Sequence, residues 1–276
     1  MFKKGPIKLK KLANFSEIYE NYDTFIIDLW GVIHNGIHLY EESVDVVEKL
    51  ISKNKKVIFL SNAPRPSENV IKFLKKIEMK EKYLKNVMTS GEAAMKVLKN
   101  LKYGKNFFHL GPKRDNPLFF GLEENKTSLE KCDFILCTGL IENHEKDLQY
   151  YKDLLRKNLH KKLICTNPDL IVHRGDDEEY CAGTIAKIFE SIGGKVIYIG
   201  KPYKEIYNII LKKNERNFII GDNLNTDIRG ANNLSLDCLF ITNGVHKSEF
   251  NNENDLDDLL KKYKVTSNFF QKNLRW

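Results

Sequence analysis

Two aspartates, far apart in the sequence but in matching local settings, carry the clearest chemical signal. Asp28 follows the apolar residues 25–27, and Asp222 follows a glycine at the end of the apolar run 218–220. Short apolar runs of this kind predict strands that are buried on both faces of a parallel sheet. Because open α/β sheets bind ligands at the carboxyl ends of their strands, we expect both carboxylates at that edge. Paired carboxylates there suit the binding of Mg²⁺ together with a phosphate ester.

The elements that would position these aspartates alternate between strands and helices. Apolar runs predict strands at residues 25–28, 56–60, 86–90, 107–110, 134–138, 196–199, 218–220 and 238–241, and helical spacing predicts helices at residues 43–53, 92–100, 181–192 and 203–213. Strands that alternate with helices are typical of parallel sheets covered by helices on both faces. The sequence therefore predicts an α/β protein with a Rossmann-like, doubly wound parallel sheet.

The middle of the chain differs from its two ends. Beyond Gly104 the connections become longer and richer in Asn, Asp and Gly. After Gly194 the regular alternation of strands and helices seen in the first part returns. A single uninterrupted sheet does not explain this change, whereas an inserted α/β unit does. We expect a core formed by residues 1–103 and 195–276, interrupted by an inserted cap domain at residues 104–194.

The charge of the chain favours small anionic partners over nucleic acid. There are 45 Lys and Arg residues against 37 Asp and Glu residues, a formal net charge of +8. The excess is spread over short pairs such as Lys75 and Lys76, and it forms no basic stripe with base-stacking aromatic residues. This distribution speaks against nucleic-acid binding and suits the attraction of anionic substrates.

The cysteines and the apolar runs indicate a cytoplasmic protein. The 5 cysteines contain no C-x-x-C pair, and their odd number predicts buried, reduced thiols. No apolar run approaches the ~18 residues that a membrane-spanning helix requires. We therefore expect a soluble protein without a membrane partner.

Four short segments in a fixed order resemble those of a known superfamily. Residues 28–34, 60–63, 200–202 and 221–227 read DLWGVIH, LSNA, GKP and GDNLNTD. In this order they resemble the four motifs of the haloacid dehalogenase (HAD) superfamily. A cap between the second and third motifs resembles class IIA, the branch that contains nitrophenylphosphatase-like and sugar-phosphate phosphatases. Residues 166–169 and 182–183 also resemble class IIA cap elements, and the resemblance spans residues 22–250.

The resemblance implies a Mg²⁺-dependent phosphohydrolase that acts on a small phosphorylated metabolite. Asp28 would be the nucleophile, which attacks phosphorus and forms an aspartyl-phosphate. The other oxygen of Asp28, the backbone carbonyl of Trp30 and the carboxylate of Asp222 would hold Mg²⁺. Asp227 would complete the metal site by fixing a metal-bound water or Lys201.

Further residues of the motifs would contact the substrate. Ser61 and Asn62 would donate hydrogen bonds to the phosphoryl oxygens. Lys201 would stabilise the phosphoryl group and keep the nucleophile ionised. Asn167 and Asp169, in the cap, would contact the rest of the substrate.

Turn and capping roles remain open for the same residues. Ser61 and Asn62 could start the turn before the prolines that follow, and Lys201 could be a surface lysine in a Gly-Lys-Pro turn. Asp227 could cap the helix that begins after it. The pair at positions 167 and 169 could shape an Asx-turn and not touch substrate.

Trp30 is the one departure from the resembled pattern. Related phosphatases carry at this position an aspartate that acts as general acid and then base, and a positioned acid/base is worth roughly 10²–10⁴-fold in rate. Tryptophan can neither give nor take that proton. His34, His38 or Asp169 could supply it, or the leaving group could be acidic enough to depart unprotonated, as in an acyl phosphate. We interpret Asp-x-Trp as a subfamily trait.

Trp30 also motivates a second hypothesis about function. A HAD-derived binding or regulatory protein would hold a phosphorylated ligand with weak or no turnover. Class IIA relatives often pair through their caps, which leaves a homodimer open for this chain.

Overall fold

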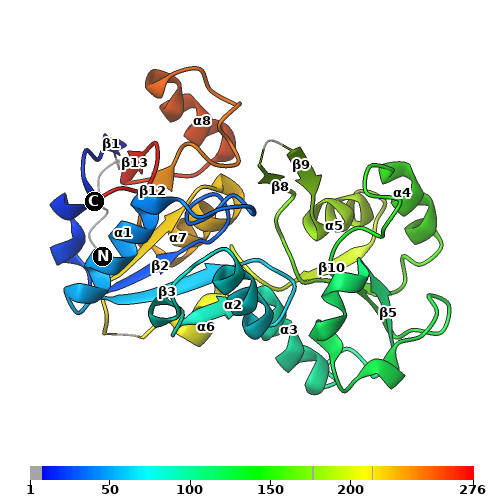
Figure 1. Ribbon diagram of the computed structural model, residues 1–276. Coiled ribbons are helices and arrows are strands. Elements are labelled where there is room, and N and C mark those ends of the chain that lie inside the picture. The colour runs from blue at the N-terminus through cyan, green and yellow to red at the C-terminus, as the bar shows by residue number, and fades with distance from the viewer. Residues whose placement is uncertain (1–7, 176, 213) are drawn as a thin grey trace.

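The structure is a computed structural model that describes residues 8–175, 177–212 and 214–276. Within these ranges the strands form a seven-stranded sheet, a four-stranded sheet and a two-stranded hairpin. Figure 1 shows the two larger sheets in two units that lie side by side, each with its own helices. We refer to them as the larger unit and the smaller unit. The predicted α/β fold is confirmed.

The larger unit is built on the seven-stranded sheet. The strand order is β1 (Lys10–Lys11), β13 (Phe269–Gln271), β12 (Asp237–Ile241), β11 (Asn217–Gly221), β2 (Thr24–Ile27), β3 (Lys56–Ser61) and β4 (Val87–Thr89). All neighbouring strands are parallel. Strands β2 and β11 lie beside each other, with Ile27 opposite Ile220. Their carboxyl ends, and the residues that follow them, therefore meet at one edge of the sheet.

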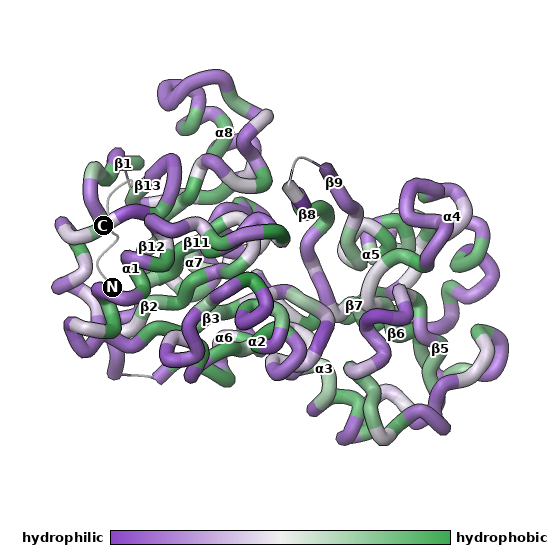
Figure 2. The backbone as a smooth tube through the Cα atoms, in the orientation of Figure 1, coloured by the Kyte–Doolittle hydropathy of each residue, from purple (hydrophilic) through white to green (hydrophobic). Residues whose placement is uncertain are grey.

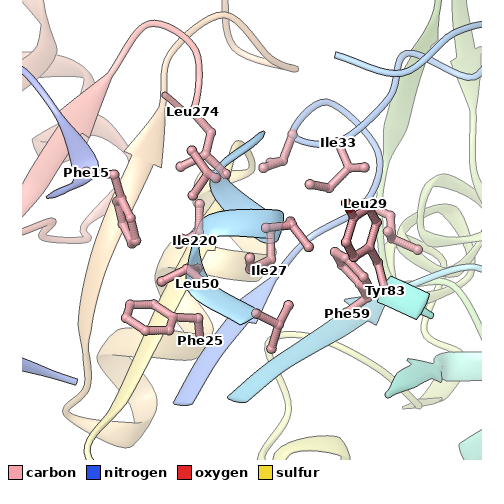
Figure 3. Close-up of a cluster of buried hydrophobic side chains, with 14 of the residues drawn as sticks. Phe15, Phe25, Ile27, Leu29, Ile33, Leu50, Phe59, Tyr83, Ile220 and Leu274 are labelled. Atoms are coloured by element: carbon pink, nitrogen blue, oxygen red, sulfur yellow. The ribbon is translucent and has the colours of Figure 1, made fainter. Parts of the chain in front are cut away.

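Helices cover both faces of this sheet because its strands are apolar on both faces. Phe25 and Ile27 of β2 pack in one hydrophobic cluster, while Ile26 packs in the cluster on the opposite face, as the two-residue period of a strand requires. Figure 3 shows the first cluster, in which Phe59 and Leu50 contribute from neighbouring elements. The helices of this unit are α1 (Glu41–Ser52), α2 (Ser67–Lys76), α3 (Ser90–Lys99), α6 (Lys204–Ile210), α7 (Arg229–Leu234) and α8 (Leu256–Tyr263).

The smaller unit repeats the same design on a smaller scale. Its strands are β10 (Lys195–Tyr198), β7 (Lys162–Cys165), β6 (Phe134–Cys137) and β5 (Phe107–Leu110), all parallel, with helices α4 (Leu148–Arg156) and α5 (Ala182–Ser191). Strands β8 (Ile171–Arg174) and β9 (Asp177–Tyr180) form an antiparallel hairpin that leaves this unit after β7. In Figure 1 the hairpin lies between the two units. Figure 2 shows that hydrophobic residues follow the central strands of the larger unit, whereas β9 is hydrophilic.

The predicted strands and helices are observed, but one predicted strand belongs to the other unit. The strand predicted at residues 196–199 was placed in the core, but β10 pairs with β7 in the smaller sheet, with Val196 opposite Leu163. An apolar run predicts a strand and does not name its neighbour, so the sequence could not assign it. We propose that the inserted unit ends after β10 and not at residue 194.

The remaining differences are local. Strands β1 and β13 were not predicted, because two or three residues are too few to show a periodicity. Helix α4 and strands β7, β8 and β9 of the smaller unit were not predicted either. The helix predicted at residues 203–213 is observed as the shorter α6, which ends at Ile210 because Leu211 has an extended backbone, and residue 213 lies outside the described residues.

Neither a disulfide nor a membrane helix occurs in the described part of the chain. All 5 cysteines are free and buried. No helix of the described residues combines the length and the apolarity needed to cross a membrane.

Candidate active site

Three buried aspartates meet at the carboxyl edge of the larger sheet. Asp28 directly follows β2, Asp222 directly follows β11, and Asp227 lies in the π-helical turn η6 (Leu224–Ile228). Carboxylate oxygens of the three residues lie within 4.8 Å of one another. Their exposed fractions are 8% for Asp28, 5% for Asp222 and 1% for Asp227. The predicted meeting of Asp28 and Asp222 is therefore observed, and Asp227 joins them.

Lys201 lies between two of these carboxylates. Its Nζ is 2.7 Å from Asp28 Oδ1 and 2.7 Å from Asp227 Oδ1, and the residue is only 2% exposed. It lies in the turn that leads from β10 into α6. A buried ammonium with two carboxylate partners is not a surface lysine, so the surface interpretation of Lys201 is wrong.

Local backbone features make room for the Asp222 carboxylate. Gly31 has φ of +81°, and a Cβ at Gly31 or at Gly244 would collide with Asp222 Oδ2. The same Oδ2 accepts a hydrogen bond from the backbone N–H of Val245 at 2.8 Å. Glycine at both positions lets two loops approach the carboxylate closely, which fixes its orientation.

The electrostatics of the site follow from burial and from the surplus of carboxylates. Burial raises the pKa of Asp28, and the charge of Asp227 raises it further against the opposing effect of Lys201. Burial also raises the pKa of Asp222 well above its usual range, and the charge of Asp28 adds to this. For Lys201, burial lowers the pKa, but the charges of Asp227 and Asp28 outweigh burial and raise it. One ammonium does not balance three carboxylates, so the site favours a further positive charge.

The donor set fits a hard divalent cation. Lys201 and the N–H of Leu29 occupy Asp28 Oδ1, at 2.7 and 2.8 Å. Among the described residues, no hydrogen bond reaches Asp28 Oδ2 or Asp222 Oδ1. Mg²⁺ prefers carboxylate oxygens of this kind and binds through one or two of them. Asp227 differs, because its two oxygens contact Lys201 at 2.7 Å and the N–H of Asn223 at 3.2 Å.

Ser61 and Asn62 lie at the end of β3, beside this site. Ser61 Oγ accepts the N–H of Ala63 at 3.1 Å, as a turn-forming serine does. Asn62 Oδ1 accepts the N–H of Lys201 at 2.8 Å, and its Nδ2 donates to Lys201 O at 3.2 Å and to Asp169 Oδ1 at 3.2 Å. Asn62 thus joins the end of β3 to the segments that carry Lys201 and Asp169.

Of the two predicted residues of the inserted unit, the structure brings one to the site. Asp169 accepts hydrogen bonds from Asn62 and from Asn223, whose Nδ2 is 3.2 Å from Asp169 Oδ1. Asn167 Oδ1 instead accepts the N–H of Asp169 at 3.2 Å, which is the Asx-turn. Burial raises the pKa of Asp169 to about 6 against the opposing charge of Lys201.

Neither histidine considered as a replacement acid lies at the site. His34 is 3% exposed, and burial lowers its pKa to about 3. Its Nδ1 accepts the N–H of Gly36 at 2.9 Å, so the ring shapes its own loop. His38 is exposed and packs edge-on against Tyr40, with ring centroids 6.1 Å apart. The structure assigns both histidines to loop packing.

A cavity of about 50 Å³ lies over the carboxylates. Asp28, Asp222 and Trp30 line it from the larger unit, and Asp169 and the β8–β9 hairpin line it from the smaller unit. A larger hollow of about 410 Å³ lies beside α3, near Lys99, and contains none of these residues. We identify the smaller cavity as the candidate active site, because only it contains the carboxylates.

Two family models match this chain on both sides of the inserted unit. The haloacid dehalogenase-like hydrolase model matches residues 25–125, and a second HAD-hydrolase-like model matches residues 198–266. The chain belongs to the haloacid dehalogenase-like hydrolases. The resemblance inferred from the four motifs is confirmed at this level.

Individual relatives cover nearly the whole length of this HAD-like hydrolase. A haloacid dehalogenase-like hydrolase structure from Brucella suis 1330 is 27% identical, with a TM-score of 0.83, and the match covers 95% of this chain and 98% of that one. Phosphoglycolate phosphatase 2 of Arabidopsis thaliana is 25% identical over 86% of this chain and 88% of its own length. Acid sugar phosphatase of Staphylococcus haemolyticus is 27% identical over 86% of this chain and 91% of its own length. These similarities include both units.

The cavity of this hydrolase also contains residues that sequence reasoning missed. Tyr40, Asn223 and Lys247 line it from the larger unit. Asn223 directly follows Asp222, so its position beside a strand end was a usable signal. The others lie in loops whose course a sequence pattern does not determine.

Proposed function

We propose that this chain is a phosphohydrolase that cleaves a small phosphorylated metabolite through an aspartyl-phosphate at Asp28. The observation that carries this proposal is the buried cluster at the sheet edge. Asp28 is 2.7 Å from the Lys201 ammonium, and its carboxylate lies within 4.8 Å of those of Asp222 and Asp227. A buried charge cluster of this kind costs stability, and chemistry at the sheet edge accounts for it.

In the proposed reaction Asp28 acts twice. Its carboxylate oxygen forms a bond to phosphorus as the bond to the leaving oxygen breaks. Water then attacks the aspartyl-phosphate, which releases phosphate and restores the carboxylate. Lys201 holds the Asp28 side chain in place through Oδ1 and supplies positive charge next to the transferred group. Asp227 keeps Lys201 oriented.

Mg²⁺ is the cofactor that we propose for this site. Asp28 Oδ2 and Asp222 Oδ1 would hold it together with the backbone carbonyl of Trp30, and Asp227 would act through Lys201. When bound, the ion offsets the negative charge shared by the carboxylates and the phosphate. Asn62 and Ser61 remain our candidates for contact with the phosphoryl oxygens.

The substrate we propose has a leaving group that departs with little help from an acid. Trp30 cannot transfer a proton, and the two nearby histidines lie outside the cavity. Asp169 does line the cavity, but its Oδ1 already accepts hydrogen bonds from Asn62 and Asn223. An acyl phosphate, whose leaving group is a carboxylate, or a phosphate ester of an acidic alcohol fits this constraint. The phosphatases named among the relatives act on different compounds, so they support the phosphatase class and no single substrate.

A panel assay tests this proposal. Purified protein is incubated with Mg²⁺ and a set of phosphorylated metabolites that includes acetyl phosphate, and phosphate release is measured. The Asp28→Asn variant keeps the size of the side chain and removes the nucleophile. We expect release by the native protein above that of the variant for at least one substrate. Equal release for every substrate would refute the proposal.

Trp30 supports one alternative, a protein that binds a phosphorylated ligand without turnover. A ligand at 100 times its Kd stabilises a protein by about 2.7 kcal/mol. Thermal stabilisation by a panel member that is not hydrolysed would favour this alternative.

We further propose a cytoplasmic location, since all 5 cysteines are free and buried.

A further inference from the structure

The side chain of Trp30 reaches from the larger unit to the β8–β9 hairpin. Its Nε1–H donates a hydrogen bond to the backbone carbonyl of His173, with an N···O distance of 2.7 Å. A second hydrogen bond joins the same segments, from the N–H of Gly175 to the carbonyl of Asn35 at 3.1 Å. Two hydrogen bonds therefore fasten the hairpin to the loop that follows Asp28.

The loop around Trp30 holds the indole in one orientation. Gly36 has φ of +86°, and a Cβ there would lie only 2.6 Å from the indole Cη2. The His34 ring packs edge-on against the indole, with ring centroids 5.1 Å apart. The glycine lets the indole lie against the backbone, and the buried histidine supports it. The indole N–H is thus directed at the hairpin by packing and not by the hydrogen bond alone.

The fastened hairpin keeps the cavity small. Asp28 and Asp222 line the cavity from one side, and Ile171, Val172 and His173 line it from the other. Its volume is about 50 Å³. Pockets for drug-sized ligands usually measure roughly 300–1,000 Å³. A substrate with a bulky leaving group must therefore displace the hairpin, whereas a small one need not.

We propose that Trp30 is a positioning residue whose indole N–H latches the β8–β9 hairpin over the cavity and thereby selects substrates with a small leaving group. Trp30 occupies the position at which related phosphatases carry the acid. Its indole N–H holds the hairpin closed over the cavity. The latch itself is independent of the proposed phosphatase function, and only its kinetic consequence rests on that function.

The consequence for kinetics follows from comparing the free enzyme with the transition state. A small substrate reacts under the closed hairpin, so the latch is present in both states and cancels in kcat/KM. A bulky substrate reacts only with the hairpin displaced, so the enzyme must first break the latch. Loss of one neutral hydrogen bond should then favour bulky substrates by about 2- to 12-fold.

Trp30→Phe tests the latch, because phenylalanine keeps an aromatic ring and removes the N–H. Trp276→Phe is the matched control, since Trp276 packs on Tyr19 with ring centroids 4.9 Å apart and does not line the cavity. Amide hydrogen exchange in β8 and β9 should become about 2- to 12-fold faster in Trp30→Phe and stay unchanged in Trp276→Phe. Unchanged exchange in the hairpin, or an equal rise in every strand, would overturn the proposal.

The selectivity is measured with two phosphates that both have acidic leaving groups, acetyl phosphate and the bulkier 4-methylumbelliferyl phosphate. The ratio of kcat/KM for the bulky over the small substrate should rise about 2- to 12-fold in Trp30→Phe only. An unchanged ratio would overturn the selective role. If the native protein hydrolyses neither compound, the metabolite panel decides on the phosphatase proposal, and hydrogen exchange decides on the latch. Should Trp30→Phe not fold, Gly36→Ala displaces the indole without changing Trp30.

Discussion

At the scale of single residues, Lys201 determines how much negative charge the buried site can hold. It contacts Asp28 and Asp227 at 2.7 Å each, and it is almost completely buried. A carboxylate in such a place stays ionised only next to a compensating charge. Asp222 lies in the same cluster but makes no ion pair with the lysine among the described contacts. The lysine therefore stabilises two of the carboxylates and leaves the third to a cation.

Replacing Lys201 by methionine should destabilise the protein strongly. The variant leaves two buried carboxylates without their partner, and breaking a buried ion pair in this way costs about 3–5 kcal/mol. Urea unfolding without divalent cations measures the loss in free energy of unfolding. Lys261→Met is the control, because Lys261 pairs with Asp258 at 2.8 Å on the exposed surface and should matter little. Similar losses in both variants would contradict the argument.

Replacing Trp30 by aspartate should introduce a proton donor for the leaving group. We expect hydrolysis of an unactivated alkyl phosphate, such as glycerol 3-phosphate, to rise by roughly 10²–10⁴-fold, the usual value of a general acid. Trp30→Asn is the matched control, since asparagine has the same size and no transferable proton. Steady-state assays at saturating substrate give the comparison. Equal activity of the two variants would show that an opened hairpin, and not the acid, caused the change.

At the scale of elements, strand ends explain why part of the site could be predicted. Asp28 and Asp222 follow apolar strands, and neighbouring parallel strands must end at one edge. The contacts of Asn62 with Asp169 and of Trp30 with His173 could not be predicted. Those contacts depend on how the larger and the smaller unit are placed relative to each other, which no local sequence pattern determines.

A second polar contact joins the two units away from the carboxylate cluster. Arg65, just before α2, lies with Nε 3.7 Å from Asp115 Oδ1 in η4 (Lys113–Phe119) of the smaller unit. Asp115 is 2% exposed. Burial raises its pKa to about 6, although the charges of Arg65 and Arg114 act in the opposite direction. This carboxyl group therefore binds its proton more tightly in the folded protein than in the unfolded chain.

Asp115 should make the stability of the native protein fall as the pH rises. Its pKa is about 6 when folded, against an ordinary value of 3.8. The stabilisation is fully present below the unfolded pKa and is lost as the pH passes the folded pKa, which amounts to about 2 kcal/mol between pH 4 and 7. Asp115→Asn removes this titration. Urea unfolding at pH 4, 5, 6 and 7 should show a steeper decline for the native protein, and parallel curves would contradict the assignment.

At the scale of the whole molecule, the active site lies where the larger and the smaller unit meet. Strands β2, β3 and β11 supply the charged edge, and the β8–β9 hairpin closes the cavity from the smaller unit. Each unit has its own hydrophobic cluster, and a further cluster joins them, in which Ala94 and Leu98 of α3 pack with Phe107 of β5. The carboxylate cluster, however, belongs entirely to the larger unit. A cation that binds there should stabilise the larger unit whether or not the hairpin is closed.

Mg²⁺ should therefore raise the melting temperature of the native protein. At 100 times its Kd a ligand adds about 2.7 kcal/mol, which corresponds to a rise of about 5–10 °C for a chain of this size. Asp222→Asn removes one ligand and one uncompensated buried charge. That variant should melt higher than the native protein without Mg²⁺ and respond little when Mg²⁺ is added.

Asp258→Asn is the control for this experiment, because Asp258 is an exposed carboxylate that pairs with Lys261 at 2.8 Å. It should keep the full response to Mg²⁺. Differential scanning calorimetry, with and without Mg²⁺ and with EDTA as the metal-free reference, measures all three proteins. A full Mg²⁺ response in Asp222→Asn would place the cation elsewhere, and the role of the paired carboxylates would have to be abandoned. A lower melting temperature of Asp222→Asn in EDTA would instead show that the Val245 N–H to Asp222 hydrogen bond outweighs the charge repulsion.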